Sequence, residues 1–244
     1  MGRITANDGL HCSSGWRKMR IQINANESTE RRISLPHYKR GEAYLNGAGR
    51  RFFDISFASC FMVVLLPLML IIGIMVKATS SGPVIYLHKR VGKGGKVLYI
   101  YKFRTMIDQA DQKFDLFSKA QMEEWERNYK VTNDPRVTWF GRILRVTSLD
   151  ELPQLLNILK GEMSVIGPRP IIESELELYG RDKARFLSVK PGWTGYWQAF
   201  ARSECSYEDR MKMELMYIDN ACLRWDLKIL TASVLRVLSC RGAK

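Results

Sequence analysis

The chain has 244 residues, enough for one or two domains with a real hydrophobic core. It carries 38 Lys and Arg against 25 Asp and Glu, a formal net charge of +13, so we expect polyanionic partners such as nucleic acid, anionic lipid or phosphorylated substrates. The five cysteines form no CxxC pair and only three histidines are present, which argues against a zinc site and predicts reduced thiols.

Residues 1–48 are polar and irregular, with no sustained apolar periodicity and no signal-peptide core. We predict that they form a flexible N-terminal tail. The rest of the chain is expected to divide into a membrane segment over residues 49–78 and a soluble domain over residues 79–240.

The membrane segment contains the strongest single feature of the sequence. Residues 55–76 read ISFASCFMVVLLPLMLIIGIMV, which is 22 residues without a charge. An unbroken helix of this length would extend about 33 Å, at ~1.5 Å per residue, and could cross a hydrocarbon core of about 30 Å. The alternative is a buried core helix, which the length and the uniform apolar character argue against.

Pro67 lies near the middle of this run. Proline removes a backbone hydrogen bond and clashes with the preceding turn, so we expect a kink or a break in the helix. If the helix folds back at this point, each arm is only about 15–18 Å long, and neither arm crosses the bilayer.

Both flanks of the segment are basic. Arg50 and Arg51 precede it, with Asp54 as their predicted charge partner, and seven Lys or Arg without any acid lie between residues 77 and 104. Cytoplasmic flanks carry the excess of positive charge, so both ends are predicted to be cytoplasmic. These residues favour a re-entrant helix-break-helix hairpin, and a single span with the soluble domain outside the cell stays open as the alternative.

The soluble domain is predicted to be mainly α-helical with a small β component. Two β-favouring runs, VIYL and VLYIYKF, flank a turn at residues 92–95. Helical patterns cover residues 110–130, 136–146, 149–160, 172–188, 207–217 and 223–238. We expect amphipathic helices among them to lie against the membrane surface.

Asp150 and Glu151 are the candidate catalytic residues. With Ser148 they fit a capping box, so both acids could merely complement the N-terminus of a helix. In the functional interpretation one carboxylate attacks phosphorus as a nucleophile, and the other holds Mg²⁺, which bridges phosphate groups. The local pattern leaves both interpretations open.

A site of this kind needs cations that bind phosphate. Arg169 lies in a stiff Gly-Pro-Arg-Pro loop and loses little freedom when it binds a phosphate through two hydrogen bonds. Lys102 and Arg104 alternate along the sequence, so they share one face if that run is a strand. Arg142 and Arg145 precede the acidic pair. Together these residues predict a phosphate-handling site.

Three segments together resemble the bacterial sugar transferase family, the monotopic phosphoglycosyl transferases: KFRTM (102–106), SLDELPQLLNILKGEMSVIGPRP (148–170) and PGWTGYWQ (191–198). The resemblance covers about residues 48–238. It implies transfer of a hexose-1-phosphate from a UDP-sugar to undecaprenyl phosphate, with release of UMP, as the initiating step of exopolysaccharide or capsule synthesis.

The resemblance also implies the setting of the enzyme. Mg²⁺ is the expected cofactor, and the cytoplasmic membrane of a bacterium is the expected location, with the catalytic domain facing the cytosol. UDP-sugar, undecaprenyl phosphate and the cytoplasmic leaflet are the expected partners, nucleic acid is not, and a homo-oligomer and downstream glycosyltransferases are further partners that the family allows.

Carried onto this chain, the family roles give a ping-pong mechanism. Asp150 matches the nucleophile that forms a covalent aspartyl-phosphosugar intermediate. Glu151 matches the second member of the dyad and is associated with Mg²⁺, and Arg169 matches the arginine that binds phosphate.

Further matches and departures concern the ends of the domain. Arg51 and Asp54 match the basic and acidic positions at the start of the re-entrant helix, and Pro67 matches its helix-breaking proline. The chain lacks the polytopic membrane domain of longer members, so it is expected to be a minimal catalytic form. Residues 201–204 read ARSE where many relatives have a GRN-type sequence, and residues 175–180 are similar to members that handle galactose or glucose.

A rival interpretation is a membrane-tethered protein without enzymatic activity, which binds nucleic acid or anionic lipid through its basic surface. It explains the net charge and the apolar run, but leaves the Asp150–Glu151 pair and Arg169 without a role. Salt-sensitive DNA binding would favour it.

Overall fold

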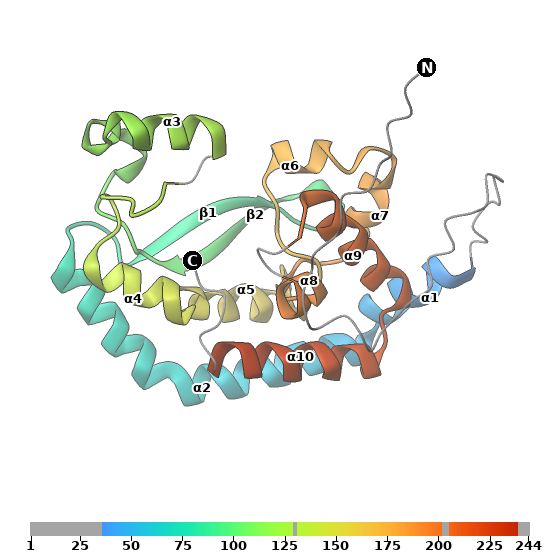
Figure 1. Cartoon of the computed structure of the whole chain (residues 1–244). Coiled ribbons are helices and arrows are strands. Elements are labelled where there is room, and N and C mark those ends of the chain that lie inside the picture. Colours follow the sequence, from blue (N-terminus) through green and yellow to red (C-terminus); the bar gives the residue numbers. More distant parts are fainter. Residues whose placement is uncertain (1–35, 129–130, 202–204, 239–244) are drawn as a thin grey trace, which may run out of the picture. The chain divides into compact units, whose positions relative to one another are not determined.

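The computed structural model describes residues 36–128, 131–201 and 205–238, and these form one compact unit (Figure 1). Helix α1, Pro36–Leu45, lies inside the predicted tail, and its Leu45 is buried. The prediction of irregular chain is therefore wrong for these ten residues, while residues 1–35 lie outside the described part. A Cβ added at Gly41 would lie 2.1 Å from the carbonyl oxygen of Ile218, so glycine lets α1 pack closely against helix α9, Tyr207–Asn220.

Helix α2, Ala48–Thr79, contains the apolar run. Among the described residues it is the one helix whose length and composition would allow it to cross a membrane. Pro67 lies inside a helix that stays continuous, and Figure 1 shows that α2 changes direction along its length. The helix therefore changes direction without the break that the sequence analysis allowed. Most of the middle of α2 is exposed, as shown by Val63, Val64 and Ile74 at 74%, 68% and 69%.

The small β component takes two forms. Strands β1, Ile85–Val91, and β2, Val97–Phe103, pair antiparallel around the predicted turn. Strands β3, Ser164–Ile166, and β4, Gly192–Thr194, pair parallel, and this second pair was missed by the sequence analysis. Short parallel strands separated by a long connection leave little local pattern.

Helices make up most of the remaining described chain, which confirms the prediction of a mainly α-helical domain with few strands. They are α3 (Lys119–Asn128), α4 (Trp139–Thr147), α5 (Leu155–Lys160), α6 (Glu173–Glu177), α7 (Lys183–Leu187), α8 (Tyr196–Phe200), α9 and α10 (Leu223–Leu238). Short 3₁₀ turns connect them: η2 (Lys93–Gly95), η3 (Ala110–Gln112), η4 (Phe114–Leu116), η5 (Leu149–Gln154) and η6 (Gly180–Asp182).

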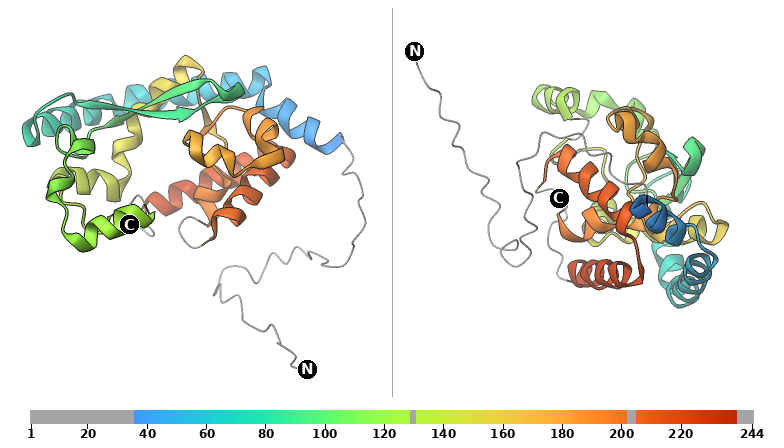
Figure 2. Two further views of the ribbon diagram at one scale, coloured as in Figure 1. Left: turned by 90° about the horizontal axis from the view of Figure 1, so that it is seen from above. Right: turned by 90° about the vertical axis from the view of Figure 1, so that its right-hand side faces the viewer.

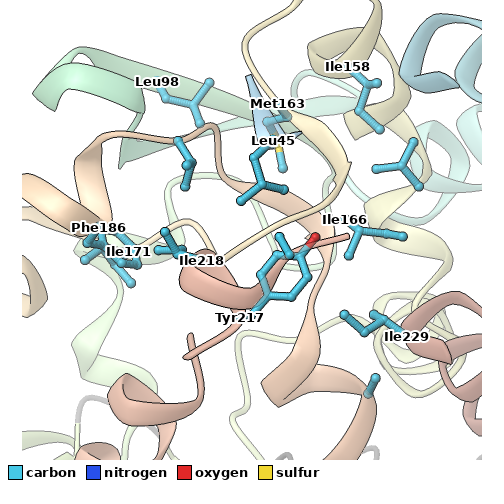
Figure 3. Packing of buried hydrophobic residues seen from close by; sticks show 14 of the residues in the cluster. Leu45, Leu98, Ile158, Met163, Ile166, Ile171, Phe186, Tyr217, Ile218 and Ile229 are labelled. Atoms are coloured by element: carbon cyan, nitrogen blue, oxygen red, sulfur yellow. The ribbon is translucent and has the colours of Figure 1, made fainter. Parts of the chain in front are cut away.

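Two clusters of buried apolar side chains hold these elements together. In the larger cluster Tyr217 of α9 lies among Ile166 of β3 and Ile229 of α10 (Figure 3). The smaller cluster packs Ile72 and Val76 of α2 against residues of other elements: Phe103, Leu144 and Leu152. Because Leu152 belongs to η5, the C-terminal part of α2 packs under the turn that carries the two candidate carboxylates.

Candidate active site

Asp150 and Glu151 lie on the 3₁₀ turn η5, directly after α4. Ser148 precedes them in the left-handed conformation, with φ 58°, and its N–H closes α4 by bonding to the carbonyls of Arg145 and Leu144. A helix N-cap has extended backbone angles and a capping side chain, and in the described structure the Ser148 hydroxyl caps no helix. The capping-box interpretation was therefore wrong, because Ser148 closes α4 in the left-handed conformation and precedes the 3₁₀ turn η5 without a side-chain cap.

Burial dominates the chemistry of Asp150, which is 9% exposed. It raises the pKa of this carboxyl from 3.8 to about 6, while Lys102 lowers it, Glu151 raises it and Arg145 lowers it. Because the carboxylate is buried, few water molecules can solvate its charge. At neutral pH Asp150 is ionised and poorly solvated, as a nucleophile should be.

Lys102 joins the two carboxylates. It lies on β2 opposite Tyr86 of β1, and its Nζ donates to Glu151 Oε1 at 2.7 Å and lies 3.9 Å from Asp150 Oδ2. The ammonium group therefore offsets the repulsion between two adjacent acids. Of the cations predicted from the sequence, Lys102 is the one that forms ion pairs with both acids in the described structure.

Arg145 lies near Asp150, whereas Arg104 binds the end of α2. Arg145 acts on the charge of Asp150, since it lowers the pKa of that carboxyl, and its Nε donates to Thr105 Oγ1 at 2.9 Å. Strand β2 ends at Phe103, so Arg104 lies beyond the strand face that it was predicted to share with Lys102. Its guanidinium donates to the carbonyl of Ser80 at 2.8 Å, at the end of α2. The phosphate-binding role of Arg104 stays a prediction.

Arg169 is positioned by the pairing of two segments that are far apart in sequence. The N–H of Gly167 donates to the carbonyl of Thr194, and the N–H of Gly192 donates to the carbonyl of Pro168. A Cβ on Gly192 would lie 2.1 Å from the nitrogen of Gly167, so this close approach requires glycine. The Arg169 guanidinium lies 5.5 Å from the ring centroid of Trp197 on α8.

Arg90 extends the cationic surface along β1 and His88 lies beside it on the same strand, and neither residue was predicted from the sequence. They alternate on the strand face that includes Tyr86, opposite Lys102. Burial lowers the pKa of His88 to about 4, with further lowering by Arg90, Lys102 and Arg169. His88 is thus neutral at physiological pH and lies within the fields of both Lys102 and Arg169. The period-2 alternation in residues 85–91 could have indicated these side chains.

The two acids suit Mg²⁺ only together with substrate oxygens. Among the described residues no three Asp, Glu, His or Cys gather as a metal cluster. Mg²⁺ is commonly held by one or two carboxylates plus phosphate oxygens, which matches the donor set of Asp150 and Glu151. The Glu151 side chain is 35% exposed, so it is open to a cation that arrives with the substrate.

The start of α2 binds the domain through Arg50 more than through the predicted Arg51. Arg50 Nε lies 3.5 Å from Asp54, and Asp54 also accepts from Ser164 Oγ and from the N–H of Val165, each at 2.9 Å. Arg51 donates instead to the carbonyls at the end of α5. The predicted charge partnership of Asp54 is confirmed for Arg50 and wrong for Arg51.

Known proteins share most of this sequence. Residues 45–240 match the family described as bacterial sugar transferase. The chain is 40% identical over 223 residues to the exopolysaccharide production protein ExoY of Rhizobium meliloti, which covers 90% of this chain and 99% of the relative. It is 41% identical over 211 residues to an undecaprenyl-phosphate galactose phosphotransferase of Salmonella typhimurium, covering 84% of this chain and 43% of the relative.

A further relative is the UDP-glucose:undecaprenyl-phosphate glucose-1-phosphate transferase of Klebsiella pneumoniae. It is 36% identical over 220 residues, which cover 85% of this chain and 44% of the relative. Because the family match spans most of the chain and ExoY is covered almost completely, the chain belongs to the bacterial sugar transferase family and is a transferase.

Proposed function

We propose that this transferase moves a hexose-1-phosphate from a UDP-sugar to undecaprenyl phosphate, with release of UMP, as the initiating step of exopolysaccharide or capsule synthesis. The observation that carries the proposal is the desolvated carboxylate of Asp150, held beside Glu151 and Lys102. The names of the relatives from Salmonella and Klebsiella support the lipid acceptor. Membership of a transferase family argues against the rival of a basic tether without activity.

The proposed reaction has two displacements at one phosphorus atom. A carboxylate oxygen of Asp150 attacks the β-phosphorus of the UDP-sugar, the bond to the bridging oxygen breaks, and UMP leaves with the electron pair. A phosphate oxygen of undecaprenyl phosphate then attacks the same phosphorus, and the bond to Asp150 breaks to restore the carboxylate. Lys102 and Arg145 offset the negative charge in both steps, and Arg169 binds phosphate.

Mg²⁺ belongs to this proposal as the expected cofactor. Glu151, with oxygens of the substrate phosphates, would hold it. When bound, the cation would supply neutralisation of charge on the diphosphate. The Lys102 ammonium already pairs with Oε1 of Glu151, so the protein itself provides part of that neutralisation.

The membrane arrangement that we propose is a re-entrant helix. Both ends of α2 bind the same compact unit: Arg50 donates to Ser164 Oγ near the start, and Val76 packs with Phe103 near the end. A helix that crosses the bilayer places its ends on opposite sides of about 30 Å of hydrocarbon. Exposed apolar residues also occur on α10, among them Leu227 and Leu235, and α2 and α10 lie at the same edge of the unit (Figures 1 and 2). This edge would enter the cytoplasmic leaflet.

Cysteine labelling in bacterial cells tests this arrangement. In a chain whose native cysteines are replaced by serine, Asn46→Cys and Lys77→Cys place thiols at exposed positions near the two ends of α2. We expect both to react with a membrane-impermeant maleimide only after the cytoplasmic face is opened. Val64→Cys, in the exposed apolar middle, should stay protected. Labelling of positions 46 and 77 from opposite sides would show a single span instead.

The pH dependence of UMP release tests the state of Asp150. Only the ionised carboxylate attacks phosphorus, and burial raises its pKa to about 6, so activity should rise with pH through about 6. Below that value the rate should fall about tenfold per pH unit. Lys102→Met removes a charge that lowers this pKa, so its midpoint should move to higher pH, whereas the exposed Lys119→Met should leave the midpoint in place. A midpoint near 4, or no movement in Lys102→Met, would contradict the assignment.

The test of the function itself is a donor screen. Purified full-length protein is mixed with undecaprenyl phosphate, Mg²⁺ and single UDP-sugars, including UDP-galactose and UDP-glucose, and UMP is measured. We expect UMP release that depends on the lipid acceptor for continued turnover. No UMP from any UDP-sugar would overturn the proposal.

A further inference from the structure

Three arginines on different elements, Arg90, Arg169 and Arg210, lie close enough to act on one another's charge. Two of them have buried side-chain nitrogen atoms without a hydrogen-bond partner in the described structure. Arg210 of α9 is 8% exposed, and its Nε and Nη2 atoms are buried with no hydrogen-bond partner among the described residues. The Nε atom of Arg90 is likewise buried without a hydrogen-bond partner in the described structure. Buried charged groups are normally satisfied, so unpartnered guanidinium donors indicate that a ligand completes the site.

Aromatic rings pack against two of the three guanidinium groups, those of Arg169 and Arg210. The Arg210 guanidinium carbon lies 4.7 Å from the ring centroid of Trp197 and 5.0 Å from that of Tyr207. The guanidinium of Arg169 lies 5.5 Å from the same Trp197 ring. Trp197 therefore holds two of the arginines, and the Tyr207 hydroxyl is a further buried polar group without a partner in the described chain.

Nearby acids do not balance the three positive charges. Glu175 lies 3.6 Å from Arg210 Nη1 and 3.8 Å from Arg90 Nη1, and Glu214 lies 3.6 Å from Arg210 Nε. None of these three distances is short enough for a hydrogen bond. Two carboxylates against Arg90, Arg169 and Arg210 leave one excess positive charge. Burial lowers the pKa of Arg90, and Arg169 and Arg210 lower it further. The excess positive charge of the cluster therefore favours binding of an anion.

The cluster is continuous with the candidate active site. Its Arg210 lies near the start of α9, whereas Trp197 belongs to α8, which packs against α10 of the proposed lipid-facing edge. Arg90 lies four residues along β1 from Tyr86, the partner of Lys102, which is about 13 Å at ~3.3 Å per residue. His88 lies between them on the same strand face. Figure 1 shows α6 and the start of α9 on the far side of the unit from α2 and α10. A phosphate carried by a water-soluble molecule fits this position better than one anchored in the leaflet.

We infer that Arg90 and Arg210, together with Arg169, bind the phosphate of the nucleotide portion of the donor, the part that leaves as UMP. The inference rests on the proposed function and adds two binding residues to it. The unpartnered N–H groups of Arg90 and Arg210 would donate hydrogen bonds to the phosphate oxygens.

The test compares UMP binding and steady-state kinetics in full-length variants. Arg90→Gln and Arg210→Gln should each weaken UMP binding, measured by calorimetry, by at least about tenfold, and should raise KM for the UDP-sugar more than they lower kcat. Arg210→Lys keeps the charge and should recover part of the loss. The exposed Arg181→Gln is the matched control and should bind UMP like the wild type.

The outcomes separate this inference from the proposed function. Wild-type protein that releases UMP, while Arg90→Gln and Arg210→Gln bind UMP with unchanged affinity, would overturn the inference alone. Wild-type protein that releases no UMP would overturn the proposed function. If both variants keep UMP affinity and lose affinity for undecaprenyl phosphate, the phosphate bound here belongs to the acceptor, and the inference fails. If Arg210→Gln does not fold, the UMP affinity of Arg90→Gln still tests the inference, because Arg90 is less buried than Arg210.

Discussion

Replacing Asp150 by asparagine is expected to reduce UMP release by about 10⁴-fold or more, as in other enzymes that lose a covalent nucleophile. The amide has nearly the shape of the carboxylate but cannot attack phosphorus. Lys102 and Glu151 stay in place in this variant, so any remaining turnover would measure what the cationic surroundings achieve without a covalent step.

The loss should not come from unfolding. Burial raises the folded-state pKa of Asp150 from 3.8 to about 6, so its ionised form destabilises the fold at neutral pH, and this cost is absent when the pH lies below the ordinary value. The neutral amide should therefore leave the melting temperature unchanged or raise it. A lower melting temperature would mean that Asp150 has a structural role instead.

A trapping experiment checks the covalent step. Wild-type protein, incubated with UDP-sugar labelled in the sugar and without lipid acceptor, should carry label after acid quenching. Asp150→Asn should carry none. Glu151→Gln keeps the nucleophile and should still form the adduct, but more slowly and with a weaker dependence on Mg²⁺. Near-normal UMP release by Asp150→Asn would show that another group attacks phosphorus.

Local sequence patterns predicted the parts of this protein that depend on local chemistry. The apolar run of α2, the strands around residues 92–95 and the adjacency of Asp150 and Glu151 can all be recognised within short windows. Lys102 was placed on the correct strand because alternation fixes a face. The family resemblance then connected segments that no local rule could join.

Local sequence patterns could not predict contacts between segments that are distant in sequence. The parallel pairing of β3 with β4 brings Gly167 to Gly192 and so sets the position of Arg169. The same limitation explains the error at Ser148, whose pattern suits a side-chain cap although its backbone closes α4 and its hydroxyl caps no helix. Arg50 and Arg51 are also equivalent in sequence, and only tertiary packing decides which of them is buried.

Arg50→Met is expected to destabilise the fold by about 3–5 kcal/mol, the usual cost of breaking a buried ion pair by removing one partner. Arg50 is 4% exposed, pairs with Asp54 and Asp226, and donates to Ser164 Oγ and to the carbonyl of Ile166. Its loss leaves two carboxylates buried, at 2% and 3% exposure, without their cation. Since Arg50 joins α2 and α10 to β3, these two helices and the loop of Arg169 should loosen together.

Thermal unfolding in detergent, with Arg51→Met as the matched control, measures this effect. Arg51 is partly exposed and donates to two carbonyls at the end of α5, so its loss should cost less, about 1.5–3 kcal/mol. Adding Asp226→Asn to Arg50→Met removes one of the stranded charges and should recover part of the stability, although Tyr44 and Tyr217 still donate to that side chain. Equal losses for Arg50→Met and Arg51→Met, with no recovery in the double variant, would mean that the buried pair does not anchor α2. The attachment would then depend on the packing of Val76 and Ile72 at the other end of the helix.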